Sequence, residues 1–427
     1  MCDNAPKTIP SEILCEIFQL LCSKPISLHV LDNSSCSGEF PWAVGQVCKR
    51  WREVFLSYPH LWTSLYLRHH STDIVGVDRL HEMTRRTLLY LERSKRLPLT
   101  IAVHSTTPYE EVSESIENFP RTMWKLLLSC SGRWERADLA LSHEPPLLDL
   151  LRCKMPIVKS LKLHVELMIY SSYLELYNPF TSAPRLTEVD LLGWFGGSAF
   201  PWSQLTKVKI SLIDGEPLRC RKLEMILSHL QNVEELRMSK IEVRPIDLHN
   251  NRPSHFQLAS LRMLEVSIYS REILGRIKAP SLEHLWVDWC SIYQEQDYSL
   301  VFTEELSFFI RRSSCHIRRL TLEKYVSQLF PRLLRLLSSL EALCIKTMDF
   351  GHGSFLAEHF THMNDGVCLP NLRELEVTCL RGRDDEKLMT TASRLLETQS
   401  EQSRLVSVSR EDVPLQPTSV RISMSFK

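Results

Sequence analysis

Glycine is scarce in this sequence. Only 13 of the 427 residues are Gly, about 3%, against roughly 7% in an average protein. Loops that hold phosphate groups expose backbone amides at glycine turns, and neither GxxxxGK nor GxGxxG occurs. The GxSxG pattern of many serine hydrolases is also missing. These absences argue against an enzyme, although a Ser, His and Asp triad assembled from distant positions stays compatible with the sequence.

Paired metal-binding motifs are absent as well. Neither CxxC nor HExxH occurs, and the 13 cysteines are an odd number in a long chain. The N-terminus lacks the basic start and apolar stretch of a secretory signal, so we expect an intracellular protein, cytoplasmic or nuclear, with reduced thiols. His352, His359 and His362 lack a second ligand motif and are interpreted as part of a solvated loop and helix end. We expect no metal and no cofactor.

Neither sign of charge is in excess. Lys and Arg together number 51, as do Asp and Glu, so the formal net charge is zero and no global field attracts nucleic acid or an anionic membrane. No apolar run reaches the roughly 18 residues of a spanning helix. Even the stretch LFPRLLRLLSSLEALCI contains Arg332, Arg335 and Glu341. We therefore predict neither a nucleic-acid partner nor a membrane partner.

Leucine, in contrast, is abundant. It accounts for 67 residues, about 16% of the chain, and beyond residue 150 the phrase apolar-x-x-apolar-x-apolar returns at least nine times. The middle residues of successive copies lie about 27 residues apart on average, which fits degenerate leucine-rich repeats of ~20 to 29 residues. The apolar triplets are Val158, Leu161, Leu163; Leu186, Val189, Leu191; Leu205, Val208, Ile210; Val233, Leu236, Met238; Leu261, Leu264, Val266; Leu282, Leu285, Val287; Ile317, Leu320, Leu322; Leu340, Leu343, Ile345; and Leu372, Leu375, Val377.

Stretches between these phrases have the apolar spacing of amphipathic helices, for example RLHEMTRRTLLYLERSK and TEELSFFIRR. A strand followed by a helix in each repeat predicts an α/β fold, a leucine-rich-repeat solenoid with a curved parallel sheet and helices on its outer face. We assign residues 68–150 to connecting helices and first irregular repeats, and residues 151–380 to the solenoid. Residues 381–427 are predicted to form a closing helix and a polar tail.

Residues between the apolar positions of each strand point the other way, onto the open concave face. Acidic and basic side chains alternate along this face, which suits a protein partner better than a polyanion. Trp286 has the composition of an interface anchor, because tryptophan contributes a large desolvated area to binding hot spots. The alternative is that a long loop covers it. The candidate substrate-binding residues are Lys207, Lys209, Glu235, Arg237, His284, Trp286, Asp288 and Arg319.

Two amphipathic helices are predicted near the N-terminus. PSEILCEIFQLL, residues 10–21, has an apolar stripe, and PWAVGQVCKRWREVFL, residues 41–56, has a second one. The stripe of the first helix is wider than one small neighbour can cover, so each helix must pack on other helices or on a partner protein.

These two segments resemble an F-box. IPSEILCEIFQLL followed by VCKRWREVFLSYPHLWTSLYL matches the family pattern over residues 8–67, and it is most similar to the F-box-like domains that open many fungal leucine-rich proteins. The resemblance implies a short three-helix domain that binds an Skp-family adaptor and thereby joins a cullin-RING ubiquitin ligase. The positions that match the family's adaptor-binding pattern are Ile9, Pro10, Ile13, Leu14, Ile17, Phe18, Val47, Cys48 and Trp51.

The sequence departs from this family at two points. Ile9 replaces the usual Leu, which conserves volume, and the polar stretch at residues 24–41 makes the connection roughly a dozen residues longer than usual. The expected function is that of a substrate-recognition subunit of an SCF-type ubiquitin ligase, which is not itself an enzyme and whose protein substrate is unknown. The alternative is a ligase-independent leucine-rich scaffold in which the F-box-like helices act as a cap.

Overall fold

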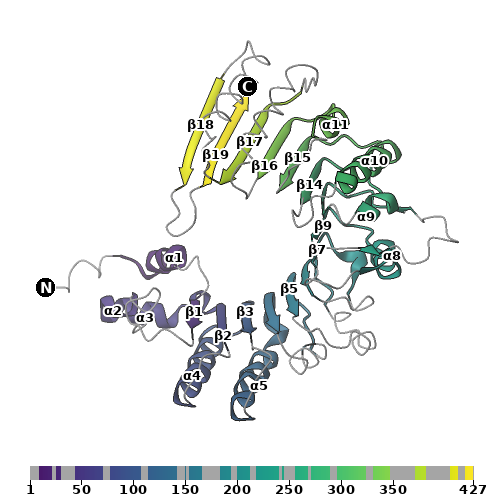
Figure 1. The fold of residues 1–427 in the computed structure, drawn as a ribbon. Helices are drawn as coiled ribbons and strands as arrows, with labels where there is room; N and C mark the ends of the chain where they lie inside the picture. Colours follow the sequence, from purple (N-terminus) through teal and green to yellow (C-terminus); the bar gives the residue numbers. More distant parts are fainter. Residues whose placement is uncertain are drawn as a thin grey trace. The chain divides into compact units, whose positions relative to one another are not determined.

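The computed structural model describes residues 9–21, 26–29, 44–70, 77–106, 114–141, 150, 153–165, 183–193, 200–211, 218–239, 243–244, 255–267, 271–288, 296–323, 330–346, 371–380, 404–411 and 419–426. The chain divides into two compact units, Met1–Pro201 and Trp202–Lys427, which we describe separately (Figure 1). This division falls inside the range 151–380 that the sequence assigned to one continuous array.

The first unit begins with a group of short helices. They are α1 (Ser11–Leu21), α2 (Val44–Val47), α3 (Lys49–Ser57) and the 3-10 helix η2 (Pro59–Trp62). The prediction of one continuous helix over residues 41–56 is wrong, because the backbone of Cys48 is extended and its Sγ accepts a hydrogen bond from the Trp51 amide at 3.4 Å. The break lets α2 fold back on α3, where Arg52 donates to the Gly45 carbonyl at 2.7 Å.

Aromatic side chains hold this helical group together. Phe18 of α1 meets Trp51 of α3 edge to face, with ring centroids 5.2 Å apart. Trp62 is buried, lies 4.9 Å from Phe55, and donates from Nε1 to the Phe55 carbonyl at 3.2 Å. It also contacts helix α4 (Val77–Arg93), where the Tyr90 ring centroid is 4.8 Å away and the Arg93 guanidinium lies 4.5 Å from the Trp62 centroid. Trp62 therefore attaches the N-terminal helices to the rest of the first unit.

Parallel strands form the remainder of the first unit. Along the sheet they follow chain order: β1 (Ile26–His29), β2 (Ser64–His70), β3 (Leu99–Thr106), β4 (Trp134–Leu141), β5 (Ser160–Val165) and β6 (Glu188–Leu192). Helices α4 and α5 (Glu114–Ser129), with the short turn η3 (Ser131–Arg133), connect successive strands. β1 lies within the predicted polar insert at residues 24–41, and it pairs with β2 in parallel.

The second unit continues the same pattern. Its parallel strands are β7 (Lys207–Ser211), β9 (Glu235–Ser239), β12 (Met263–Ser267), β14 (His284–Asp288), β15 (Arg319–Glu323), β16 (Ala342–Lys346) and β17 (Glu374–Leu380). Between them lie α8 (Cys220–His229), α9 (Arg271–Arg276), α10 (Gln296–Ser313) and α11 (Phe330–Arg335), on one side of the strands (Figure 1). Two minor parallel pairs join β8 (Leu218–Arg219) to β10 (Val243–Arg244) and β11 (Phe256–Gln257) to β13 (Ile277–Lys278).

The predicted apolar triplets form the core. Every triplet residue is at most 8% exposed apart from Val377, whose side chain lies outside the described part of the chain. Residues of opposite parity are more exposed on β6 and β7, whereas β12 is buried along its whole length and Thr321, Ala342 and Cys344 are buried on β15 and β16. The mixed α/β fold with a long parallel sheet is therefore confirmed.

The C-terminal segment differs from the prediction. Residues 404–426 hold β18 (Arg404–Glu411) and β19 (Ser419–Phe426), an antiparallel pair in which β19 also runs antiparallel to β17. The prediction of a polar tail is thus wrong here, because SVRISMSF alternates apolar and polar residues with the period of a strand, as does the VSVS within RLVSVSRE. The predicted closing helix at residues 381–403 lies outside the described residues.

Candidate functional site

The residues that match the F-box pattern occupy three kinds of environment. Pro10, Ile13 and Val47 are exposed, with Ile13 at 50% and Val47 at 54%. Ile9, Ile17, Cys48 and Trp51 are half-buried. Leu14 and Phe18 are completely buried. Leu14 and Phe18 therefore face the interior of the first unit, whereas Pro10, Ile13 and Val47 are accessible at its surface.

Helix α1 carries more apolar surface than the first unit covers. At about 100° per residue, its apolar side chains form one continuous arc about 160° wide. One half of the arc, Leu14 and Phe18, faces the core, whereas Ile13, Leu20 and Leu21 on the other half are 50%, 77% and 54% exposed. Leu20 and Leu21 belong to the predicted stripe but not to the predicted adaptor-binding set.

Exposed apolar residues are concentrated at this end of the chain. Of the nine large hydrophobic side chains that are exposed in the described part of the protein, five lie between residues 13 and 56. They are Ile13, Leu20, Leu21, Val47 and Leu56. Exposed large apolar side chains are typical of a protein-binding surface where they form a contiguous patch. We call Ile13, Leu20, Leu21 and Val47 the apolar helix surface.

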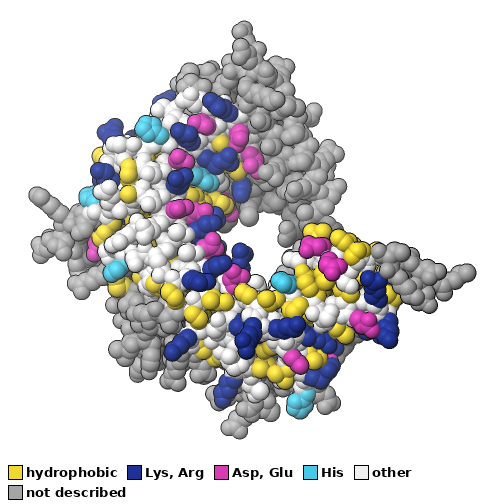
Figure 2. All heavy atoms as spheres, turned by 180° about the vertical axis from the view of Figure 1, so that it is seen from behind, with side chains coloured by type: hydrophobic (Ala, Val, Ile, Leu, Met, Phe, Trp, Pro, Cys, Tyr) yellow, Lys and Arg dark blue, Asp and Glu magenta, His cyan; other side chains and the backbone are white. Residues whose placement is uncertain are grey.

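The second candidate site is the open strand face of the second unit. The register places Lys209, Arg237, Glu265, Trp286 and Thr321 side by side on five successive strands. A parallel row holds Lys207, Glu235, Met263, His284 and Arg319. The structure therefore brings the predicted substrate-binding residues together. In the upper part of Figure 2, which is the second unit, basic and acidic side chains alternate along this face.

Trp286 lies at the centre of this face between two cations. The Arg237 guanidinium is 5.6 Å from its ring centroid, and the Lys346 ammonium is 4.8 Å from it. Its Nε1 is buried and has no hydrogen-bond partner among the described residues. Lys346 forms no ion pair with another described residue, so its ammonium retains charge for a ligand. The spacing of the strand phrase puts Lys346 on this face, but its position beside Trp286 depends on contacts across three strands.

Arg237 is held by two carboxylates. Its guanidinium lies 3.7 Å from Glu235 and 3.8 Å from Glu265, and Glu235 also lies 3.6 Å from the Lys207 ammonium. Burial raises the pKa of Glu265, and the attraction of Arg237 opposes that shift. Charges on this side of Trp286 are therefore largely balanced.

His284 and Arg319 lie on the other side. Burial, reinforced by the positive charges of Arg319 and Arg237, lowers the pKa of His284 to about 4. The His284 Nε2 lies 3.0 Å from the Thr321 hydroxyl, and Arg319 donates to Glu374 at 3.0 Å. Asp288 is only 6% exposed. At neutral pH this face thus presents a neutral imidazole next to a tryptophan ring.

Four polar side chains of the first unit form a connected series of polar contacts that the sequence did not predict. The Tyr66 hydroxyl lies 3.3 Å from Nδ1 of His104, whose Nε2 lies 3.4 Å from Asp138, and Lys162 donates to Asp138 at 3.1 Å. Burial alone would raise the pKa of Asp138, but hydrogen bonds from His104 and Lys162 outweigh it and hold that pKa below its usual range. The four residues come from four different strands, β2 to β5, so only the register brings them together.

In the described part of the protein, no group of three or more His, Cys, Asp or Glu side chains is placed to hold a metal ion. His352, His359 and His362 lie outside that part. No described helix is both long and apolar enough to cross a bilayer. Neither a protein-family model nor a curated protein matches the sequence.

Proposed function

We propose that this chain is the substrate-recognition subunit of an SCF-type ubiquitin ligase. In this proposal the apolar helix surface binds an Skp-family adaptor. The observation that carries it is the divided apolar arc of α1, in which Leu14 and Phe18 anchor the helix while Ile13, Leu20 and Leu21 remain 50% to 77% exposed. An arc of this width needs a second apolar partner. The resemblance of the segment to an F-box favours an Skp-family adaptor as that partner.

The target protein would bind the open strand face of the second unit. Trp286 supplies a rigid aromatic area, and the Lys346 ammonium, 4.8 Å from the centroid of its ring, supplies positive charge beside it. Large side chains that are partly desolvated and surrounded by polar groups are typical of interface hot spots. The chain itself would perform no chemistry. It would raise the local concentration of target lysines near the ubiquitin-conjugating enzyme by holding both on one scaffold.

Co-elution with a purified Skp-family adaptor in size-exclusion chromatography tests the proposal. The variant replaces Ile13, Leu20 and Val47 by Ser, all exposed positions at which substitution leaves the core intact. A matched control replaces Leu88, Val301 and Phe308 by Ser, since these side chains are also exposed and lie elsewhere. We expect the native chain and the control to co-elute with the adaptor, and the helix-surface variant to elute alone.

The second candidate function is a ligase-independent scaffold. The observation in its favour is Trp62, which packs the N-terminal helices on Tyr90 of α4, as a structural cap would. If the native chain fails to co-elute with the adaptor, the cap interpretation replaces the ligase proposal.

A further inference from the structure

One edge of the first unit's sheet is rich in basic residues. The segments that lead into β3, β4, β5 and β6 lie side by side, because parallel strands all begin at the same edge. The Lys159 amide donates to the Glu135 carbonyl at 2.8 Å, and the Thr187 amide donates to the Lys159 carbonyl at 2.9 Å, which confirms this neighbourhood. Residues 94–99, 130–135, 153–159 and 183–187 contain six Lys or Arg residues and one acid, Glu135.

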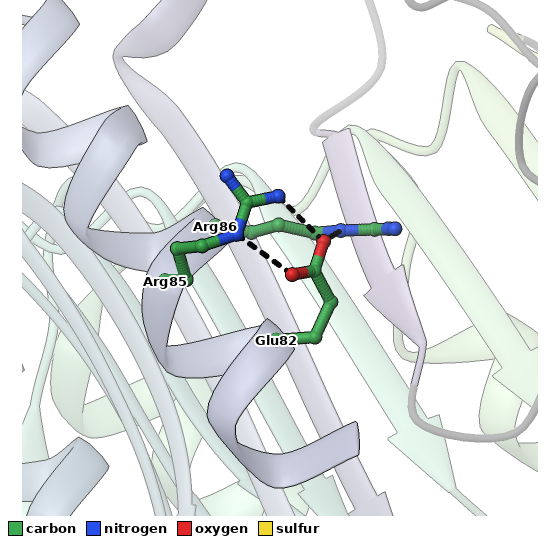
Figure 3. A network of polar contacts seen from close by, with 3 residues as sticks. All are labelled: Glu82, Arg85 and Arg86. Carbon is green, nitrogen blue, oxygen red and sulfur yellow. Dashed lines mark hydrogen bonds and ion pairs between the residues drawn. The ribbon is translucent and has the colours of Figure 1, made fainter. Parts of the chain in front are cut away.

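Two of these six cations are already engaged. Lys159 forms an ion pair with Glu135 at 2.6 Å. Arg133 donates to the Leu97 carbonyl at 3.0 Å and to the Ser94 hydroxyl at 2.7 Å, so it secures the end of α4. Helix α4 shows the same neutralisation, because Arg85 and Arg86 both donate to Glu82 and lower its pKa to about 2 (Figure 3).

The remaining four cations are free. Lys95, Arg96, Lys154 and Arg185 are exposed, and none of them has an ion pair or side-chain hydrogen bond with a described residue. Glu92, the acid nearest to Lys95 along the chain, does not pair with it. We call these four residues the basic rim. Because the whole chain has a formal net charge of zero, this excess of positive charge is local to the basic rim.

Lys95 occupies a position that ordinarily favours glycine. Its φ is 53°, in the left-handed region, and it directly follows the last turn of α4. Helices commonly end on a glycine in this conformation, since a side chain there costs conformational energy. Here the position carries a cation instead.

We propose that the basic rim binds a short acidic segment of a partner protein, independently of the proposed ligase function. Three steps of about 4.8 Å separate β3 from β6, so the rim extends over about 15 Å, the length of four or five extended residues. A peptide with several Asp or Glu side chains in this length would pair with the four free cations. Such pairing steers association and gives specificity through charge.

The surroundings of the rim favour a peptide over other polyanions. Single-stranded nucleic acid binds on exposed aromatic side chains as well as cations, and membranes bind through apolar residues beside the cations. None of the large hydrophobic side chains that are exposed in the described part of the protein lies in the four rim segments.

Fluorescence anisotropy with a labelled hexaglutamate peptide tests this inference at low ionic strength. The rim variant replaces Lys95, Arg96, Lys154 and Arg185 by Glu. The control replaces the exposed cations Lys125, Lys278, Arg311 and Arg335 by Glu, which changes the net charge by the same amount. We expect the rim variant to lose at least about tenfold in affinity and the control to lose less than about twofold, with native binding weakening as salt is added.

Lys95→Gly separates binding from folding. It removes one cation and relieves the left-handed backbone, so the thermal midpoint should not fall while peptide affinity drops about threefold. Unchanged affinity in the rim variant, or no peptide binding by the native chain, would overturn the proposal. Tighter binding of a six-nucleotide single-stranded DNA or of phosphatidylserine vesicles than of the peptide, lost in the rim variant, would replace it with that ligand.

Discussion

His284 couples the open strand face to pH. Its imidazole is half-buried beside Trp286, and the positive charges of Arg319, Arg237 and Lys346 add to the effect of burial, while Glu235 opposes it. The pKa in the folded chain is about 4, against 6.5 in an unfolded chain. Between these two values the unfolded state binds more protons than the folded state. Stability therefore falls as the pH drops from 6.5 towards 4.

Replacing His284 by Gln should reduce this loss. Gln can keep a hydrogen bond to the Thr321 hydroxyl but does not take up a proton in this range. We expect the free energy of unfolding to fall by about 1 kcal/mol less in the variant than in the native chain between pH 7 and pH 5, after allowance for partial exposure. Urea unfolding at both pH values measures the difference. Equal losses in the two proteins would show that His284 is not a source of the pH dependence.

Charged residues that precede the strands of the second unit favour one order and register of those strands. In the main sheet, the residue immediately before each strand from β9 to β17 is charged, and the sign alternates from one strand to its neighbour. The order is Glu234, Arg262, Glu283, Arg318, Glu341 and Arg373, which we call the charge ladder. Backbone bonds connect its members, as from the Arg262 amide to the Glu234 carbonyl at 2.8 Å, and Arg318 pairs with Glu341 at 3.8 Å. Opposite charges on neighbouring strands favour this order and register.

Substitution of Glu283 by Lys should disrupt the ladder. It puts a cation between Arg262 and Arg318, so that three positive charges follow one another across the strands. We expect the free energy of unfolding to fall by about 1 kcal/mol, or the thermal midpoint by roughly 2–4 °C. A variant with all six signs inverted retains the alternation and should unfold near the native temperature. If the inverted ladder is as unstable as Glu283→Lys, individual contacts and not the alternation determine stability.

The sequence predicted the parts of the fold that repeat. The apolar triplets and the helices between them follow from spacing alone, because every repeat must bury the same positions. The break at Cys48 could not be predicted from spacing, because the apolar residues of α2 and α3 together have the spacing of a single uninterrupted helix. β19 had a readable signal, the strict alternation in SVRISMSF, and β18 had a weaker one in the VSVS of RLVSVSRE.

The candidate sites were predictable only in part. The composition of the open face followed from the strand phrase, as did the choice of Trp286. The chain from Tyr66 through His104 to Asp138 was missed because its members are about 35 residues apart and meet only across strands. The division of α1 into a buried and an exposed half was not predictable either. It depends on which elements pack against the helix, and helical periodicity contains no information about them.

The two proposed binding surfaces belong to different units of the molecule. The first unit carries the apolar helix surface, and the second carries the face around Trp286. A receptor subunit needs such a division, because the adaptor and the target must bind at the same time. The basic rim of the first unit adds a third surface for an acidic segment, whose test does not depend on the adaptor.

Isothermal titration calorimetry of the native chain with a purified Skp-family adaptor at several temperatures directly tests the proposed adaptor binding. Burial of Ile13, Leu20, Leu21 and Val47 predicts a one-to-one complex with a negative heat-capacity change. The variant with Ile13, Leu20 and Val47 replaced by Ser should bind at least about a hundredfold more weakly, since each buried side chain contributes about 1 kcal/mol or more. No binding by the native chain, or equal binding by the variant, would contradict the account.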